Sequence, residues 1–444
     1  MRLWIESAQQ SLPGLAGETT GDYVRTLTTE DQFLALVANI PGRALSFYLA
    51  HGTEAAPRGS CARPPLEVEG WGEARAALQG ALTALERDTP LETVTQTLLA
   101  ALPEGVHLPV ALLQVRQGSW ASLVECDAPP LFMARGGRLV LLPVIEEESY
   151  GRLIRRCDFD LQDGDHMALV SEGFLQGLRW DRRWGWRDIA IATRRITATR
   201  CDAGQLAGAL VKQYQRRGTR DAGPVTSDGL SATLAPALER PGAREPERAP
   251  GSRDGASAGV SHLPTAVSVL AMFVRPMRTL TLWSGPPASR AAEREMLDRL
   301  MAEEDVRVIS GDTTAEIAAR LLGAQLVIER RPPDGWREVP PTSRMIDPAG
   351  TEEVDLVTEG VVTMTVARGR LASAHHPRDV AGQGDGASRL AQMLLTADKV
   401  QFLVGTAVNP AQVAADGTPL RRVVVEKLVE DLRARGKIVS VEHF

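Results

Sequence analysis

The sequence predicts an α+β protein with two domains, the first built from antiparallel hairpins and the second from alternating strands and helices. The chain has 444 residues, which is too long for a single hydrophobic core. Between the two patterns lies the segment 218–262, which is rich in proline, glycine and charged residues. We therefore expect a first domain at 1–274, with 218–262 as a flexible insertion, and a second domain at 278–444.

The first domain contains short apolar runs bounded by turn residues, which are typical of buried strands. Two of these runs flank Gly136-Gly137 and predict a hairpin. The predicted strands are 31–39, 110–115, 131–135, 138–142, 166–171 and 266–274. The predicted helices are 73–87, 90–102 and 205–214.

The second domain begins with a strand–helix–strand–helix succession, which is typical of an α/β layer. The predicted strands are 280–283, 306–310 and 400–404. The predicted helices are 289–304, 315–322 and 421–435.

Composition and charge exclude several classes of protein. The chain is 43% hydrophobic and 24% charged, as in an ordinary soluble protein, and its net charge of −6 argues against nucleic acid as the main partner. The longest apolar run, 266–274, is far shorter than the roughly 20 residues that a membrane span requires. The first residues contain an acid, Glu6, and no long apolar run, so they do not resemble a signal peptide. We therefore expect no membrane partner and a cytoplasmic location.

The cysteines support neither a zinc site nor a disulfide framework. Their spacing is wide, and no two of them form a C-x-x-C pair. We expect free thiols at Cys61, Cys126, Cys157 and Cys201.

Three short motifs near the ends of predicted strands carry the polar residues of a candidate site. They are 17–22, which ends in Asp22, then 36–42, which contains Asn39 and Ile40, and then 164–173, which contains Glu172. In order and spacing they resemble the metal-binding strands of PPM-type protein serine/threonine phosphatases, in particular the branch of stage II sporulation protein E. In that family the second motif usually reads Ala-Asp-Gly and the third Ser-Asp-Gly. This chain has Asn39 and Glu172 in place of those two aspartates.

The resemblance implies a PPM phosphatase-like α-β-β-α sandwich, with two antiparallel sheets between helices, followed by a smaller α/β domain. It also implies hydrolysis of a phosphoserine or phosphothreonine by water held between Mn²⁺ or Mg²⁺ ions, with no catalytic group beyond that water. The metal ligands that it implies are Asp22, Asn39 in the bridging position, the carbonyl of Ile40, and Glu172. Because Asn39 is neutral, one bridging charge is lost, and we expect metal binding to be weak or absent.

Two motifs of the family can be aligned with this chain in more than one way. For the fourth aspartate of the family, the Arg-Pro junction at 275–276 favours an alignment on Thr265 or Ala266, neither of which is a plausible ligand. Asp228 also looks like that motif and stays a candidate ligand, although an aspartate beside glycine is ordinarily a turn residue. For the second motif, the stretch 51–56 is a weaker alternative, because it lies too far downstream and contains no aspartate.

The sequence therefore supports two functional hypotheses. The first is a metal-dependent protein serine/threonine phosphatase of the sporulation-E type that acts on a bacterial phosphoprotein regulator. The alternative is a catalytically inactive pseudophosphatase that binds a phosphoprotein or a small ligand, and the small number of acids at the site favours it. The implied partner is a phosphoprotein, as substrate or regulator, and a homodimer is left open.

One motif of the second domain suggests a different chemistry. The turn 311–314 lies between a predicted strand and a predicted helix, and its N–H groups and hydroxyls could hold an anion at the start of that helix. The commoner alternative is that Asp312 or Thr313 caps the helix.

Overall fold

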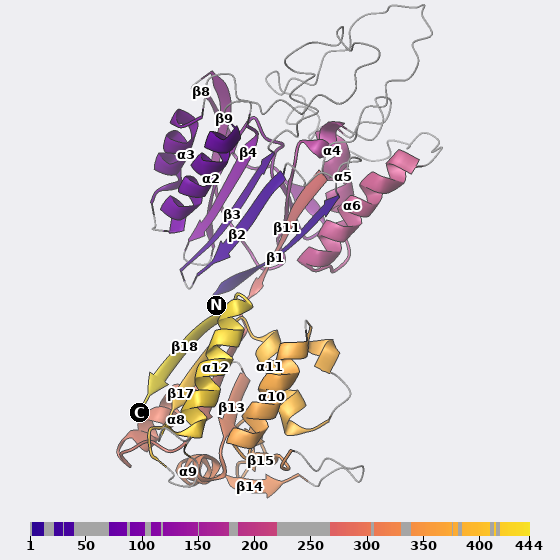
Figure 1. Cartoon of the computed structure of the whole chain (residues 1–444). Helices are drawn as coiled ribbons and strands as arrows, with labels where there is room; N and C mark the ends of the chain where they lie inside the picture. Colours follow the sequence, from indigo (N-terminus) through magenta and orange to yellow (C-terminus); the bar gives the residue numbers. More distant parts are fainter. Residues whose placement is uncertain are drawn as a thin grey trace, which may run out of the picture. The chain divides into compact units, whose positions relative to one another are not determined.

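The computed structural model describes two compact units, Arg2–Arg275 and Pro276–Phe444 (Figure 1). The described residues are 2–12, 22–29, 31–39, 71–86, 89–102, 108–116, 119–149, 151–176, 185–219, 267–302, 306–329, 339–374, 376–380, 384–408, 413 and 418–444. Several residues named above lie outside these ranges: Ile40, 51–56, Cys61, 220–262 of the expected insertion, Asp228, Thr265 and Ala266.

The first unit contains two sheets. The six-stranded sheet has the order β2-β3-β4-β5-β9-β8, and the five-stranded sheet has the order β1-β11-β10-β6-β7. The strands are β1 (Leu3–Leu12), β2 (Asp22–Thr28), β3 (Gln32–Asn39), β4 (Val110–Arg116), β5 (Trp120–Cys126), β6 (Phe132–Arg135), β7 (Arg138–Val140), β8 (Ile145–Ser149), β9 (Arg152–Asp160), β10 (His166–Val170) and β11 (Val267–Pro276). The helices are α2 (Trp71–Glu86), α3 (Leu91–Ala100), α4 (Gly173–Gln176), α5 (Trp186–Thr197) and α6 (Ala203–Thr219).

Alternation of side chains along the strands gives each sheet two apolar faces. Successive residues of a strand point to opposite faces, so β3, which is apolar from Phe33 to Ala38, contributes to two cores. One core joins the two sheets and contains Val37, Leu113, Met167 and Leu270. A second joins the six-stranded sheet to α2 and α3 through Leu36, Leu78 and Leu98, and a third joins the five-stranded sheet to α5 and α6 through Val269, Ile189 and Leu210.

The second unit has one sheet, in the order β14-β15-β16-β13-β12-β17-β18. The five strands from β16 to β18 are parallel to one another, and β15 is antiparallel to β16. The strands are β12 (Thr279–Ser284), β13 (Val306–Ser310), β14 (Gln325–Ile328), β15 (Ser343–Ile346), β16 (Leu356–Thr358), β17 (Lys399–Val404) and β18 (Ile438–His443). The helices are α8 (Ala292–Met301), α9 (Asp312–Leu322), α10 (Val361–Ser373), the 3-10 helix η2 (Pro377–Val380), α11 (Gly386–Thr396) and α12 (Leu420–Ala434).

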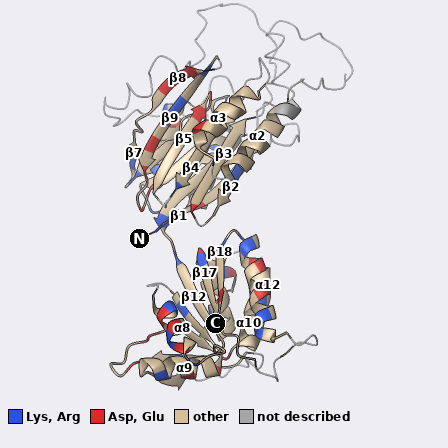
Figure 2. Cartoon of the chain, turned by 90° about the vertical axis from the view of Figure 1, so that its left-hand side faces the viewer, with Lys and Arg blue, Asp and Glu red and all other residues tan. Residues whose placement is uncertain are grey.

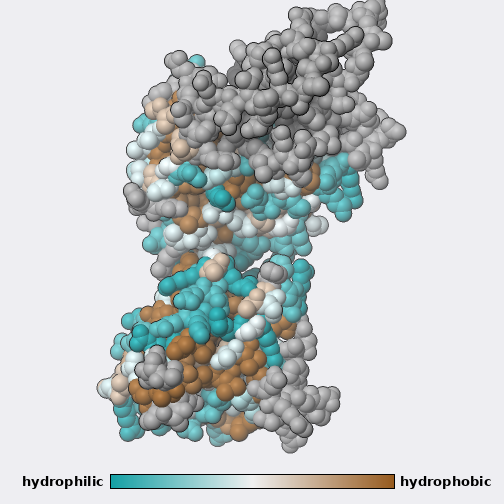
Figure 3. Space-filling model, viewed as in Figure 1, coloured by the Kyte–Doolittle hydropathy of each residue, from teal (hydrophilic) through white to brown (hydrophobic). Residues whose placement is uncertain are grey.

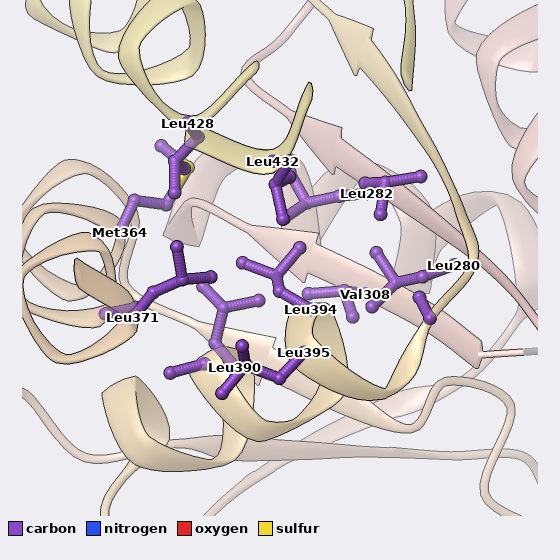
Figure 4. Close-up of a cluster of buried hydrophobic side chains, with 14 of the residues drawn as sticks. Leu280, Leu282, Val308, Met364, Leu371, Leu390, Leu394, Leu395, Leu428 and Leu432 are labelled. Atoms are coloured by element: carbon purple, nitrogen blue, oxygen red, sulfur yellow. The ribbon is translucent and has the colours of Figure 1, made fainter. Parts of the chain in front are cut away.

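Helices cover both faces of this sheet. On one face, Leu280, Leu282 and Val308 pack with leucines of α10, α11 and α12 (Figure 4). On the other face, Trp283, Ile309 and Leu403 pack with α8 and α9. Because the sheet is covered on both faces, consecutive residues of one strand are buried, as Leu282 and Trp283 of β12 and Val308 and Ile309 of β13 show.

The α+β class is confirmed, because both units contain helices and sheets. The hairpin predicted at Gly136-Gly137 is observed between β6 and β7, where both glycines have positive φ angles of 56° and 73°. The helix predicted at 315–322 begins earlier, at Asp312, so most of the predicted turn 311–314 is the first turn of α9. Helix α6 continues to Thr219, past the expected start of the insertion at 218. Within the described residues, none of the helices combines the length and the apolar character that crossing a membrane would require.

Candidate functional site

Asp22 and Asn39 meet at one end of the six-stranded sheet. Asp22 is the first residue of β2, Asn39 is the last residue of β3, and the antiparallel register places them directly opposite each other. The Cβ atoms of directly opposite residues lie about 5 Å apart. The structure therefore brings these two predicted ligands together, as the sequence motifs suggested.

Three serines of the five-stranded sheet adjoin the same place. Ser171 follows β10, and its hydroxyl accepts a hydrogen bond from the Ser268 amide at 2.9 Å. The Ser268 hydroxyl lies 2.8 Å from the hydroxyl of Ser11 on β1. Ser171 and Ser268 are both completely or almost completely buried, and both lie close enough to Asp22 to affect its titration.

The Asp22 carboxylate is buried without a partner. Among the described residues, neither of its oxygens has a hydrogen-bond partner in ordinary geometry. The pKa of Asp22 is raised to about 6, mainly by burial; the hydroxyls of Ser268 and Ser171 lower it, and the negative charge of Glu172 adds to the increase. The site thus holds a carboxylate whose charge is poorly stabilised by the protein itself.

Glu172 is the third predicted ligand at this site. It follows Ser171 directly, between the end of β10 and the start of α4, and its charge acts on Asp22. Asp22, Asn39 and Glu172 therefore belong to one neighbourhood, built from both sheets. Ile40 and Asp228 lie outside the described residues, so their predicted roles as ligands stay predictions.

The acids of the described residues do not form a complete metal shell. Within that part of the chain, no group of three His, Cys, Asp or Glu side chains is arranged to hold a metal ion. The oxygen atoms present nevertheless suit a hard cation, because a carboxylate, an amide and hydroxyls are the donors that Mg²⁺ and Mn²⁺ prefer. The two buried and unpartnered oxygens of Asp22 fit such an ion best.

The second predicted site, at the start of α9, differs from the sequence prediction. Gly311 is the residue before the helix, with φ 132°, and within the described residues no side-chain hydrogen bond caps this end. The expected capping role of Asp312 or Thr313 is therefore not observed. Thr314, in the first turn, is 1% exposed, and its hydroxyl has no partner among the described residues.

Sequence reasoning missed the serines. Ser171 stands inside the third motif, next to Glu172, and this position was the one available signal. Nothing in the sequence pairs Ser268 with Ser171 or with Ser11, because these contacts depend on which strands become neighbours. The described cysteines, Cys126, Cys157 and Cys201, are free and buried.

No family model matches the chain, and no curated protein matches it. Among solved structures, it is similar to phosphatase domains. One is the phosphatase domain of SpoIIE from Bacillus subtilis, with 9% identity, a TM-score of 0.36, and coverage of 62% of this chain and 93% of that one. Another is the PP2C domain of SiaA from Pseudomonas aeruginosa, with 13% identity, a TM-score of 0.34, and coverage of 60% and 84%. A third is the serine/threonine phosphatase PstP/Ppp of Mycobacterium tuberculosis, with 13% identity, a TM-score of 0.33, and coverage of 61% and 99%.

Proposed function

We propose that the first domain, 1–274, is a PPM phosphatase-like α-β-β-α sandwich with a degenerate metal site, followed by an α/β domain at 278–444. The function of the first domain is that of a metal-dependent protein serine/threonine phosphatase of the sporulation-E type, acting on a bacterial phosphoprotein regulator. The observation that supports this most strongly is the buried, unpartnered carboxylate of Asp22 opposite Asn39.

The three candidate ligands would contribute unequally to the binding of a divalent ion. Asp22 supplies a full negative charge, Asn39 supplies only a neutral amide oxygen, and Glu172 adds a second charge nearby. When bound, Mn²⁺ or Mg²⁺ lowers the pKa of a water and stabilises negative charge on a phosphoryl group. Ser171 and Ser268 fix the ends of β10 and β11 beside Asp22 through their mutual hydrogen bonds.

The pseudophosphatase remains the second candidate function, and a specific observation favours it. Asn39 is 7% exposed and neutral at the centre of the site, and the described residues hold no group of three potential metal-binding side chains. In this alternative, the same surface binds a phosphoprotein or a small ligand without turnover.

The two functions are separated by one pair of measurements on the full chain. Hydrolysis of a phosphoserine peptide is followed with and without Mn²⁺, and binding of Mn²⁺ is measured by calorimetry in the same buffer. Mn²⁺-dependent hydrolysis that disappears in Asp22→Asn is the result expected of the phosphatase. Peptide binding with no turnover at any Mn²⁺ concentration would instead establish the alternative.

Restoring a carboxylate at position 39 should tighten metal binding. Asn39→Asp adds a negative charge directly opposite Asp22, so we expect the affinity for Mn²⁺ to rise by roughly tenfold or more, about 1.4 kcal/mol. The matched control is Thr26→Asp, which adds the same charge at an exposed position of β2 and should leave the affinity unchanged. An Asn39→Asp affinity equal to that of the control would show that the site lacks something other than this charge.

A further inference from the structure

The parallel sheet of the second unit has a polar edge where its strands end. From β12 the chain adds β13 and then β16 on one side, and afterwards places β17 and β18 on the other side of β12. The strand order thus reverses between β12 and β17. In open α/β sheets, ligands bind outside the carboxyl ends of the strands at such a reversal. The residues that follow β12 and β17 are therefore the first place to look for a ligand.

A half-buried arginine without an acidic partner lies at this reversal. The guanidinium of Arg421, from the start of α12, lies on Gly285 so closely that a Cβ there would come 1.9 Å from its Nη1 atom. Its Nη1 donates a hydrogen bond to the carbonyl of Gly405, which follows β17, at 3.2 Å. Among the described residues, no carboxylate pairs with Arg421, and burial lowers the pKa of its guanidinium. A positive charge that is partly removed from water is stabilised when an anion binds beside it.

A row of hydroxyls crosses the same edge. Ser284, Ser310 and Thr358 are register partners at the ends of β12, β13 and β16, so their side chains share one face of the sheet. The Thr358 hydroxyl donates to the Ser310 hydroxyl at 3.1 Å. Ser284 is fully buried, and its hydroxyl has no partner within the described residues. An unmet hydrogen-bonding group beside Gly285 and Arg421 is a second, independent indication of a ligand.

Two acids stand at the other end of the row. Asp312 and Glu359 follow β13 and β16, and the glycines beside them, Gly311 and Gly360, are in close contact: a Cβ on Gly360 would lie 3.4 Å from the Gly311 Cα atom. Burial raises the pKa of Glu359, and the charge of Asp312 raises it further. The acids repel an anion but accept hydrogen bonds from hydroxyl groups. The edge is thus basic beside β12 and β17, and acidic beside β13 and β16.

Apolar side chains are exposed beside this edge. Val408 lies just after β17, Leu420 is the residue before Arg421, and Val362 lies in the first turn of α10. They are 61%, 37% and 46% exposed, respectively. Figure 3 shows hydrophobic surface on this unit. A ligand that joins an anion, hydroxyl groups and a flat apolar ring matches these three kinds of contact.

We propose that the carboxyl edge of this sheet binds a nucleotide, with its phosphate on Arg421 and Ser284 beside Gly285 and its ribose hydroxyls on Asp312 and Glu359. The base lies against the exposed apolar side chains. The site belongs to the second unit alone, and it does not depend on the phosphatase proposed for the first.

Calorimetric titration of the full chain with ADP, adenosine and inorganic phosphate tests the proposal. The buffer contains EDTA, which keeps any metal ion out of the measurement. We expect ADP to bind more tightly than adenosine or phosphate. Arg421→Met should weaken ADP binding by roughly tenfold or more, because it removes a charged hydrogen-bond donor. Arg422→Met is the matched control, since Arg422 is the next residue of α12 and its guanidinium pairs with Glu426 at 2.8 Å.

Two further variants keep the outcome decisive if Arg421→Met fails to fold. Ser284→Ala should weaken both ADP and phosphate. Asp312→Asn should weaken ADP binding and leave phosphate binding unchanged, because Asp312 is assigned to the sugar. The proposal is overturned if ADP does not bind the folded wild-type chain at millimolar concentration. It is also overturned if Arg421→Met and Ser284→Ala, folded by circular dichroism, bind ADP as wild type does.

Discussion

Replacing Arg155 by methionine should lower the free energy of unfolding by about 3–5 kcal/mol, because the change leaves a buried carboxylate without its partner. Glu125 is 2% exposed, and its Oε2 atom lies 3.0 Å from Arg155 Nε. Burial raises the pKa of Glu125, and the positive charge of Arg155 is the largest influence in the opposite direction. Without Arg155, Glu125 must either carry an uncompensated charge or take up a proton.

The position of this pair explains why the effect should be large. Glu125 and Arg155 are cross-strand partners on β5 and β9. The Leu131 amide donates to Glu125 at 2.5 Å, and Arg155 donates to the Ala128 carbonyl at 2.5 Å, so the pair holds the segment that leads from one sheet to the other. The Arg155 guanidinium also lies 5.1 Å from the centre of the Trp186 ring at the start of α5. Loss of the arginine therefore affects β5, the segment between the two sheets, and α5 together.

Urea unfolding of the full chain measures this effect, and a double-mutant cycle identifies its cause. Arg156→Met is the matched control: Arg156 pairs with Glu92 and Glu147, which are largely exposed, and its loss should cost no more than about 1 kcal/mol. In the double variant Glu125→Gln with Arg155→Met, no charge is left buried, so much of the lost stability should return. A double variant as unstable as Arg155→Met alone would show that packing, and not the unpaired charge, causes the loss.

The elements with the strongest local signals were predictable from the sequence. β3 contains a continuous apolar run from Phe33 to Ala38, and the glycine pair between β6 and β7 specifies a tight turn. β8 and β9 were not predicted, because they are rich in charged residues. β8 contains Glu146, Glu147 and Glu148, is mostly exposed, and lies at the edge of its sheet, where charged side chains are tolerated (Figure 2). Such a strand gains its stability from pairing with β9, which no local pattern reveals.

The candidate site was predictable only in its outline. The motifs placed Asp22 and Asn39 near strand ends, and one register between adjacent strands then brings them together. The proximity of Ser171 and Ser268 to Asp22 requires two sheets to face each other, which is a property of the tertiary structure. The same holds for Arg421, whose contacts with Gly285 and Gly405 depend on the reversal of strand order in the second unit.

Replacing Asp22 by asparagine should stabilise the first unit above about pH 7, by roughly 3 kcal/mol in the absence of metal. The ordinary pKa of 3.8 is raised to about 6 in the folded chain. Below the ordinary value, the carboxyl is protonated in both the folded and the unfolded states, and it has no effect on stability. As the pH rises from there to about 6, the unfolded chain loses its proton first, so wild-type stability falls; above the folded pKa the penalty is constant. The amide of the Asp22→Asn variant never ionises, so the variant should escape this penalty.

The comparison is made by urea unfolding at about pH 4 and about pH 7.5, with and without Mn²⁺. The advantage of Asp22→Asn should be small at the lower pH, which is close to the ordinary pKa of 3.8, and close to its full value at the higher one. Mn²⁺ should stabilise the wild type at the higher pH and leave Asp22→Asn unchanged, because the cation compensates the charge that the variant lacks. Asp31→Asn serves as the control, since the Asp31 side chain is 93% exposed and should show neither effect. If the difference in stability between Asp22→Asn and wild type is equal at both pH values, the Asp22 carboxylate is not the poorly stabilised charge inferred from its burial. If Mn²⁺ does not change the stability of the wild type, the result favours the binding module over the phosphatase.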